Sequence, residues 1–311
     1  ADYMGRGIPV QEPRLGRYSH AHCIHRRSLY KEHWNGHGRM SKSLARILAG
    51  FTRTATAWQS RWRGAGTRLL VSQALIEDSH VATPRGTLLF RSSHPQALDY
   101  PAGLLSREPD TIAWIDKFEA PFVLWDVGAN VGAYALYAGL SPEATVIAFE
   151  PAAASYAALA ENIRINAMDG RIDAYCIALS GATKAGHLNM QNVNAASVAH
   201  AFDSLATSTG EAITPQFRQA VVGYRADDFL NAFQVPAPNY LKIDVDSIEI
   251  EILTGAENIL RSPNMKGVLV EAEGSAERLS AIRQLLADAG FDEGSHPGAG
   301  NMIFARKADA S

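Results

Sequence analysis

Acidic residues stand at or just beyond the ends of three apolar segments that have the composition of buried strands. Asp126 lies near the end of F-V-L-W-D-V (122–127), Glu150 ends T-V-I-A-F-E, and Asp244 and Asp246 follow Y-L-K-I. In an open parallel sheet, ligands bind beyond the carboxyl ends of the strands. Carboxylates at these positions could accept hydrogen bonds from ligand hydroxyls or take up a proton. The spacing therefore predicts a ligand site at one edge of a sheet.

The segment D-V-G-A-N-V-G (126–132) predicts a tight turn between a strand and a helix. Gly128 and Gly132 carry no Cβ, so the backbone can turn sharply and approach a ligand. A dinucleotide fingerprint would need a third glycine at position 130, where this chain has Asn130. The turn therefore disfavours pyrophosphate binding, and by itself it also fits a strand-to-helix connection without a ligand.

Glu150 lies 24 residues after Asp126, at the end of the second strand. A carboxylate in this position can accept hydrogen bonds from both hydroxyls of a ribose. Pro151 ends the strand and begins the next helix. The alternative interpretation of Glu150 is a solvated carboxylate at a strand end.

Strands and helices alternate from residue 122 to the end of the chain. Strands are expected at 122–127, 145–150, 172–179, 220–224, 240–245, 267–272, 290–296 and 301–306, and helices at 131–140, 153–167, 226–232, 249–261 and 275–289. Upstream, a turn and short strand are expected at 83–90 and a helix at 108–118. Nearly continuous Val, Ile and Leu in the strands indicates a parallel sheet covered on both faces. The predicted fold is a doubly wound α/β domain.

The sequence resembles the class I S-adenosylmethionine-dependent methyltransferases, and within them the FkbM-type methyltransferases. The resemblance covers roughly residues 82–306. It rests on D-V-G-A-N-V-G, F-E-P (149–151), E-N-I-R-I-N (161–166), L-K-I-D-V-D (241–246), G-A-E-N-I-L (255–260) and the upstream E-P-D-T-I-A-W-I-D (108–116). The last segment looks like members associated with surface-polysaccharide and lipid-linked sugar modification. The resemblance implies a Rossmann-like, seven-stranded, mostly parallel sheet.

The resemblance also implies an S-adenosylmethionine site. Asp126, Gly128, Asn130 and Gly132 would surround the methionine part, Glu150, followed by Pro151, would hold the ribose, and Ala178, Leu179 and Ser180 would border the adenine. K-I-D-V-D (242–246) would face the transferable methyl group. Its charged residues have an alternative interpretation as a strand that pairs its own charges.

The implied activity is transfer of a methyl group from S-adenosylmethionine to a hydroxyl oxygen of a sugar or small natural product. A general base would take the hydroxyl proton, and the candidates are Asp244, Asp246 and His200. Glu271 and Glu273 could line the same cavity. No metal site is predicted: the histidine-rich segment at 20–37 has metal-compatible side chains but no framework that would hold tetrahedral geometry.

Two departures from the family pattern keep other functions open. Ser247 stands where glycine is expected, and Ile250 where some relatives carry histidine. Either change could reshape the acceptor pocket, so a non-catalytic S-adenosylmethionine-binding or scaffold protein is one alternative. A nicotinamide-dependent oxidoreductase is the other, and Asn130 disfavours it.

The first 80 residues are expected to form a basic extension, and residues 81–311 the methyltransferase domain. Residues 1–70 contain 13 Lys and Arg against 3 Asp and Glu, a formal charge of +10, whereas the remainder contains 16 against 29, a formal charge of -13. Residues 1–40 are expected to be poorly ordered, and residues 41–63 to form a cationic amphipathic helix. This helix could dock on an anionic membrane surface, pack on its own domain or belong to a transit peptide.

The composition is that of a globular protein, with 47% hydrophobic and 20% charged residues and only two cysteines, Cys23 and Cys176. No disulfide framework is expected, so the predicted location is the cytoplasm, at the inner membrane surface if the helix docks there. The expected partner is a hydroxylated small molecule or glycan rather than a nucleic acid. The sequence does not determine the acceptor or the oligomeric state.

Overall fold

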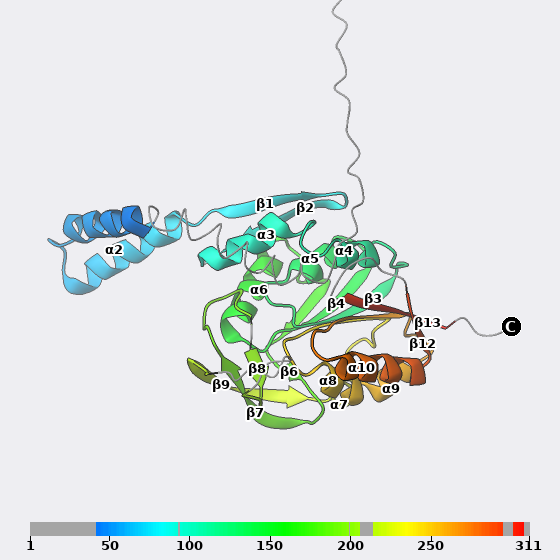
Figure 1. Cartoon of the computed structure of the whole chain (residues 1–311). Coiled ribbons are helices and arrows are strands. Elements are labelled where there is room, and N and C mark those ends of the chain that lie inside the picture. Colours follow the sequence, from blue (N-terminus) through cyan, green and yellow to red (C-terminus); the bar gives the residue numbers. More distant parts are fainter. Residues whose placement is uncertain (1–41, 93, 199, 206–213, 295–300, 308–311) are drawn as a thin grey trace, which may run out of the picture. The chain divides into compact units, whose positions relative to one another are not determined.

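The computed structural model describes residues 42–92, 94–198, 200–205, 214–294 and 301–307 (Figure 1). The chain divides into two compact units, residues 1–71 and 72–311. Strand β1 (Asp78–Thr83) lies in the second unit and spans the predicted domain boundary near residue 80. The predictions for residues 1–40, including the histidine-rich segment, lie outside the described residues.

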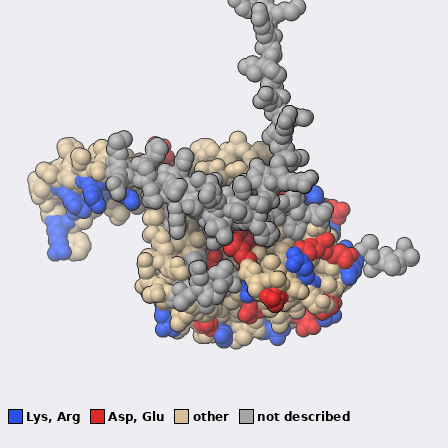
Figure 2. All heavy atoms as spheres, in the orientation of Figure 1, with Lys and Arg blue, Asp and Glu red and all other residues tan. Residues whose placement is uncertain are grey.

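In the described part of the N-terminal unit the chain forms two helices, so the prediction of one helix over 41–63 is wrong. The first helix covers 42–55, and α2 covers Arg61–Ala74. The Thr56 hydroxyl donates to the Thr52 and Arg53 carbonyls at 2.9 and 3.3 Å, at the end of the first helix. Threonine hydroxyls that bond to the preceding turn in this way compete with the helical backbone pattern. Lys and Arg side chains gather on this unit (Figure 2).

A seven-stranded sheet forms the centre of the second unit (Figure 1), in the order β12-β13-β11-β10-β3-β4-β5. All neighbouring pairs from β5 to β11 are parallel, and β13 is antiparallel to both β11 and β12. The strands are β3 (Phe122–Val127), β4 (Ala144–Phe149), β5 (Ile172–Tyr175), β10 (Tyr240–Asp244), β11 (Gly267–Glu271), β12 (Phe291–Glu293) and β13 (Asn301–Arg306). The predicted mostly parallel, doubly wound sheet is confirmed.

The chain leaves β3 toward β4 on one side and meets β10 on the other, so the strand order reverses between β3 and β10. Helices cover the sheet: α3 (Asp99–Gly103), α4 (Pro109–Ile115), α5 (Ala133–Gly139), α6 (Ala153–Ile165), α7 (Ala226–Phe233), α8 (Glu249–Gly255), α9 (Glu257–Arg261) and α10 (Ala276–Asp288), with a short 3-10 helix, η1, at Pro95–Leu98. Open α/β sheets bind their ligands where the strand order reverses, which in this sheet is between β3 and β10.

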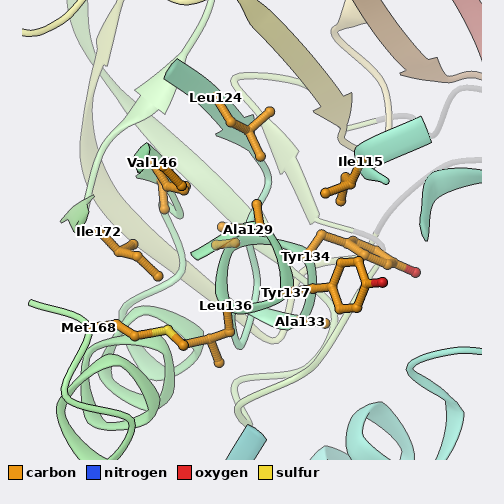
Figure 3. Packing of buried hydrophobic residues seen from close by; sticks show 14 of the residues in the cluster. Ile115, Leu124, Ala129, Ala133, Tyr134, Leu136, Tyr137, Val146, Met168 and Ile172 are labelled. Carbon is orange, nitrogen blue, oxygen red and sulfur yellow. The ribbon is translucent and has the colours of Figure 1, made fainter. Parts of the chain in front are cut away.

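The core lies on both faces of the sheet, because alternate residues of each strand point to opposite sides. On β3, Leu124 packs in the cluster with α5, whereas Trp125 packs with residues of α7 to α10. Every residue of α5 is buried. Figure 3 shows Leu124, Val146 and Ile172 reaching from three strands toward this helix. Because α5 is buried on all sides, it also holds in place the turn after β3 from which it starts.

The predicted third strand, 172–179, is wrong in its second half. The chain leaves the large sheet after β5, and β6 (Ala178–Leu179) joins β7 (Lys184–Met190), β8 (His200–Phe202) and β9 (Phe217–Tyr224) in a separate four-stranded sheet, in the order β6-β9-β7-β8. Strands β7 and β8 lie in a region where no strand was predicted. The polar and exposed residues at the start of β7 conceal its strand character in the sequence.

The predicted helix 249–261 is divided at Ala256 into α8 and α9. At this break Gly255 lies against the backbone of residue 180, where a Cβ would come within 2.5 Å of the Ser180 carbonyl oxygen. This approach brings the helix pair close to the strand end that follows β6.

A hairpin of β1 and β2 (Gly86–Arg91) lies against α6, the helix that carries E-N-I-R-I-N. Asn166 accepts from the Leu89 amide at 2.9 Å and donates to its carbonyl at 2.7 Å, and Asn162 accepts from the Arg91 amide at 2.8 Å. Asn162 also donates to the Val131 carbonyl at 2.9 Å. The two asparagines thus join an exposed strand edge to the glycine turn after β3. No strand was predicted at β1.

Candidate active site

The predicted acidic residues meet at the carboxyl edge of the central sheet. In the register of the parallel strands, Lys242 pairs with Asp126 and Asp244 pairs with Glu271. Glu150 directly follows β4, the neighbour of β3. The strand topology therefore brings together Asp126, Glu150 and Asp244, which are far apart in the sequence.

The turn after β3 is held in a left-handed conformation by three residues, with φ of 82° at Gly128, 52° at Asn130 and 92° at Gly132. At Gly128 an added Cβ would lie 1.9 Å from the Asp244 carbonyl oxygen, so β10 excludes any side chain there. Gly132 is the N-cap of α5. The predicted tight turn is confirmed, and the close approach that requires Gly128 is to the end of β10.

Glu150 binds the turn from the neighbouring strand. Its carboxylate accepts from the Asn130 amide at 2.8 Å and from the Ala152 amide at 2.7 Å. The side chain is buried, and this burial raises the pKa of Glu150 to about 7 despite the two backbone hydrogen bonds. A ligand hydroxyl that donates to this carboxylate would favour its ionised form.

Lys242 is the buried cation at the centre of the site. Its Nζ lies 2.7 Å from Asp244 and 3.6 Å from Asp126, and 4.8 Å from the ring centroid of Tyr134. Burial disfavours the ammonium, but the surrounding carboxylates outweigh this effect and raise the pKa of Lys242. Burial raises the pKa of Asp126. Lys242 and Asp244 thus form an ion pair within one strand, which is the alternative interpretation given for K-I-D-V-D.

Carboxylate oxygens of Glu108, Asp244 and Glu271 lie within 4.8 Å of one another. The negative charge of Asp244, followed by burial, raises the pKa of Glu271 to about 10. For Asp244, burial acts upward, but Lys242 and the hydrogen bonds outweigh it and lower the pKa. The two carboxyl groups at the ends of β10 and β11 therefore share one proton at neutral pH.

His200, one of the candidate bases in the sequence, is the first residue of β8 and is bonded to Asp246 and to Ser197. Its backbone amide donates to Asp246 at 2.9 Å, and its Nε2 lies 2.9 Å from the Ser197 hydroxyl oxygen. The Ser197 carbonyl lies 3.5 Å from Nδ2 of Asn130. Burial lowers the pKa of His200 to about 4, so the imidazole is neutral at pH 7.

The tautomer of His200 follows from the bonds of Ser197. The serine has a single hydroxyl hydrogen, and the Asn194 carbonyl at 2.6 Å and the Asn192 carbonyl at 3.1 Å compete for it. The Ser197 oxygen must then accept from Nε2–H of His200, which leaves Nδ1 unprotonated. This Nδ1 is buried and has no hydrogen-bond partner within the described ranges.

Other positions singled out in the sequence contribute packing and a backbone contact. The side chains of Ala178 and Leu179 pack into hydrophobic clusters around β6. Ile250 packs against the core below α8, and the Ser247 carbonyl accepts from Arg278 at 2.6 Å. Packing thus accommodates Ile250, whereas the Ser247 hydroxyl is buried without a hydrogen-bond partner in the described part of the chain.

Residues upstream of the sheet complete the site and were not predicted. The Tyr100 hydroxyl accepts from Nδ2 of Asn130 at 2.8 Å, and the Arg107 guanidinium lies 4.4 Å from the Tyr100 ring centroid. Glu108 is the N-cap residue of α4. The one sequence signal was E-P-D-T, in which the residue before a helix-starting proline is acidic.

The site has the features that an S-adenosylmethionine site requires. Within the described ranges, both carboxylate oxygens of the buried Asp126 and Oδ1 of Asn130 lack a hydrogen-bond partner, and Glu150 accepts only from backbone amides. These acceptors suit an amine and ribose hydroxyls. The residues present therefore fit the cofactor.

Comparison with known proteins bears on the chemistry. A family model described as the methyltransferase FkbM domain matches residues 126–293. The chain is 29% identical over 186 residues to the hexuronic acid methyltransferase AglP of Haloferax volcanii, covering 60% of this chain and 70% of that protein. It is 30% identical over 194 residues to the 31-O-demethyl-FK506 methyltransferase FkbM of Streptomyces tacrolimicus, covering 54% and 72%.

Solved structures similar to this chain include methyltransferases. The methyltransferase FkbM of Methylobacillus flagellatus has a TM-score of 0.42 and 14% identity, over 78% of this chain and 58% of that chain. The precorrin-6Y C5,15-methyltransferase of Geobacter metallireducens has a TM-score of 0.39 and 13% identity, over 65% and 87%. The family model matches more than half of this chain, and the chain is 29% and 30% identical to two curated methyltransferases. The chain therefore belongs to the FkbM methyltransferase family.

Proposed function

We propose that the protein transfers a methyl group from S-adenosylmethionine to a hydroxyl oxygen of a sugar or small natural product. Family membership supports methyl transfer, and the names of the two relatives, a hexuronic acid methyltransferase and a 31-O-demethyl-FK506 methyltransferase, support a hydroxylated acceptor. The observation that carries the proposal is the buried Glu150, bonded to the left-handed glycine turn at the carboxyl edge of the sheet.

In this proposal each part of the cofactor meets a distinct group of the site. Glu150 accepts from the ribose hydroxyls, and the oxygens of Asp126 and Asn130 that lack a hydrogen-bond partner within the described ranges accept from the methionine amine. Bound S-adenosylmethionine supplies a sulfonium, which is an activated methyl donor. Ala178 and Leu179 remain the proposed border of the adenine through their strand, since their side chains pack in the core.

His200 is the proposed proton acceptor. As bound S-adenosylmethionine gives up its methyl group to the acceptor oxygen, the hydroxyl proton of the acceptor would pass to Nδ1 of the neutral imidazole. Asp244 and Asp246 were the leading candidates in the sequence, but Asp244 is paired with Lys242 and shares a proton with Glu271, and Asp246 accepts from the His200 amide. In the proposal these carboxylates orient acceptor hydroxyls and the histidine.

Because Nδ1 is buried, the acceptor must reach it within hydrogen-bond distance when it binds. Alignment of the reacting atoms can supply about 7–11 kcal/mol, and a general base adds about 10² to 10⁴ in rate. Most of the rate enhancement therefore comes from positioning, and the base makes a smaller, separable contribution.

The function is tested by calorimetry followed by turnover. We expect binding of S-adenosylmethionine and S-adenosylhomocysteine but not of NAD, and then mass gain of one methyl group in a screen of hexuronic acids, other hydroxylated glycans and macrolides. Binding of NAD alone would favour the oxidoreductase alternative. Tight binding of S-adenosylmethionine with no methylated product across the screen would favour a non-catalytic binder.

The base is tested by His200→Gln, with His187→Gln, an exposed histidine on β7, as the matched control. Turnover of His200→Gln should fall by about 10² to 10⁴ with little change in S-adenosylmethionine affinity. Glu271→Gln and Asp246→Asn should lose less. If Glu271→Gln loses turnover by this amount while His200→Gln does not, the proton acceptor is the carboxyl pair of β10 and β11.

A further inference from the structure

The helix over 42–55 separates apolar and basic side chains onto opposite faces. Leu44, Ile47, Leu48, Phe51 and Ala55 recur at spacings of three and four residues, the period of one helix face. Lys42, Arg46 and Arg53 follow the same period on the opposite face. At 1.5 Å per residue this helix is about 21 Å long.

This apolar face is exposed. The exposed fraction is 66% for Ile47 and 73% for Phe51, and it reaches 82% for Trp58 and Trp62, which lie at and just after the break before α2. Soluble proteins seldom expose contiguous apolar surface of this kind unless it is an interaction site.

The N-terminal helices have no apolar core of their own. Among residues 42–77, all of which are described, only Thr56 and Gly64 are buried. The contacts that join the two helices are polar: Arg68 donates to the Thr56 hydroxyl at 2.8 Å, and the Thr67 hydroxyl donates to Gln59 at 2.9 Å. Helices of this length gain most of their stability from packing an apolar face. We therefore expect the exposed apolar face of these helices to bind an apolar partner.

The charge of this segment indicates what that partner is. Residues 42–76 contain six Lys and Arg and no Asp or Glu, since Glu77 is the first acid after Glu32. Figure 2 shows the basic side chains gathered on this unit. A second copy of the chain would bring like charges together. An anionic bilayer takes apolar side chains below its headgroups, tryptophans at the interface and cations at its surface.

We propose that residues 42–76 bind the surface of an anionic lipid bilayer, with the helix over 42–55 lying in the plane of the interface. Within the described ranges no helix is long and apolar enough to cross a membrane. In the proposal the binding is peripheral and combines burial of the apolar face with attraction between the basic face and acidic headgroups. It does not depend on the acceptor of the methyl group.

The test uses the full chain and vesicles of phosphatidylcholine with and without 25% phosphatidylglycerol. We expect co-sedimentation with the anionic vesicles, at least tenfold weaker binding to the neutral ones, and weakening by salt. Tryptophan emission should shift to shorter wavelength, because Trp58 and Trp62 are exposed whereas Trp114 and Trp125 are buried. No binding to either vesicle would overturn the proposal.

Paired variants separate charge from apolar contact. Arg46→Gln/Arg53→Gln should weaken binding about thirtyfold, since each basic residue near an anionic surface contributes about fivefold. Ile47→Ser/Phe51→Ser should abolish the emission shift. The matched control, Lys117→Gln/Lys307→Gln, removes two charges elsewhere and should bind as wild type.

Melting temperature and sedimentation velocity test whether the apolar face is instead covered by another part of the same chain or by a second copy. The proposal expects that Ile47→Ser/Phe51→Ser changes neither the oligomeric state nor, in the absence of lipid, the melting temperature. A marked loss would overturn it, because the face would then be covered by the remainder of its own chain. Self-association that the same variant abolishes would also overturn it, because the occupant would be a second copy.

Discussion

The proposed ribose contact makes S-adenosylmethionine affinity dependent on pH. Burial raises the pKa of Glu150 to about 7, so about nine-tenths of the free protein has this carboxyl ionised at pH 8 and about one-tenth at pH 6. Ribose hydroxyls donate to the ionised form, and binding therefore lowers the pKa of Glu150. The sign follows: affinity is highest above pH 7 and falls as the pH falls, by about tenfold between pH 8 and pH 6.

Glu150→Gln removes the titrating group. Loss of a hydrogen bond to a charged acceptor costs about 1.5–3 kcal/mol, so the dissociation constant at pH 8 should rise about 10- to 150-fold. The variant has one acceptor oxygen for the two backbone amides of Asn130 and Ala152, so some loss of stability is also expected. Thermal melting at each pH checks that the variant is folded where its affinity is measured.

The assay is calorimetric titration from pH 6 to pH 8.5 for wild type and variant. The α-amine of the ligand titrates at about 7.7–8.0, so the difference between the two curves isolates Glu150. Glu249→Gln is the matched control, because the pKa of Glu249 is also raised to about 7 by burial, but its carboxylate is bonded to Arg278. The reasoning is refuted if Glu150→Gln retains the wild-type pH dependence.

Two further perturbations test the framework of the site. Gly128→Ala should cost more than about 4 kcal/mol of unfolding free energy, because its Cβ would meet the Asp244 carbonyl oxygen, whereas Gly170→Ala, with nothing within 4 Å, should be close to neutral in chemical denaturation. Lys242→Met should cost about 3–5 kcal/mol, because it leaves the buried Asp126 and the partly buried Asp244 without their cation. Those carboxyls would then have folded pKa values above the unfolded ones, so the loss should be smaller at pH 5 than at pH 8. An equal loss at both pH values would contradict this account.

The large sheet could be predicted from the sequence because its strands are buried on both faces. F-V-L-W-D-V and G-V-L-V-E are almost uninterrupted apolar runs, and their predicted bounds agree with β3 and β11 within one residue. The second sheet could not be predicted in the same way. K-A-G-H-L-N-M is buried only in its last three residues, and I-D-A-Y-C-I-A-L gives no sign that the chain changes sheets after Tyr175.

The site was predictable where chemistry follows a strand end and not where it depends on distant segments. Asp126, Glu150 and Asp244 follow apolar runs, so their shared edge follows from parallel topology alone. Tyr100 and Arg107 come from a segment without a strong period, and only the structure shows that Tyr100 contacts Asn130 and that Arg107 lies over the Tyr100 ring. The tautomer of His200 depends on the hydrogen bonds of the Ser197 hydroxyl, which cannot be predicted from a single sequence.

The balance of charge in the site suits the donor that we propose. Glu108, Asp126 and the Asp244–Glu271 pair lie around Lys242, and Glu150 lies at the same edge of the sheet, so carboxyl groups outnumber the cations Lys242 and Arg107. A sulfonium and an amine would complete this balance. The positive charge of the sulfonium disperses as the methyl group leaves. An excess of negative charge around it would therefore stabilise the ground state more than the transition state and slow the chemical step. Lys242, held between Asp126 and Asp244, reduces this excess of negative charge while fixing the geometry of both carboxylates. In the function that we propose, Lys242 thus lets this acidic edge bind the cationic donor without retaining it.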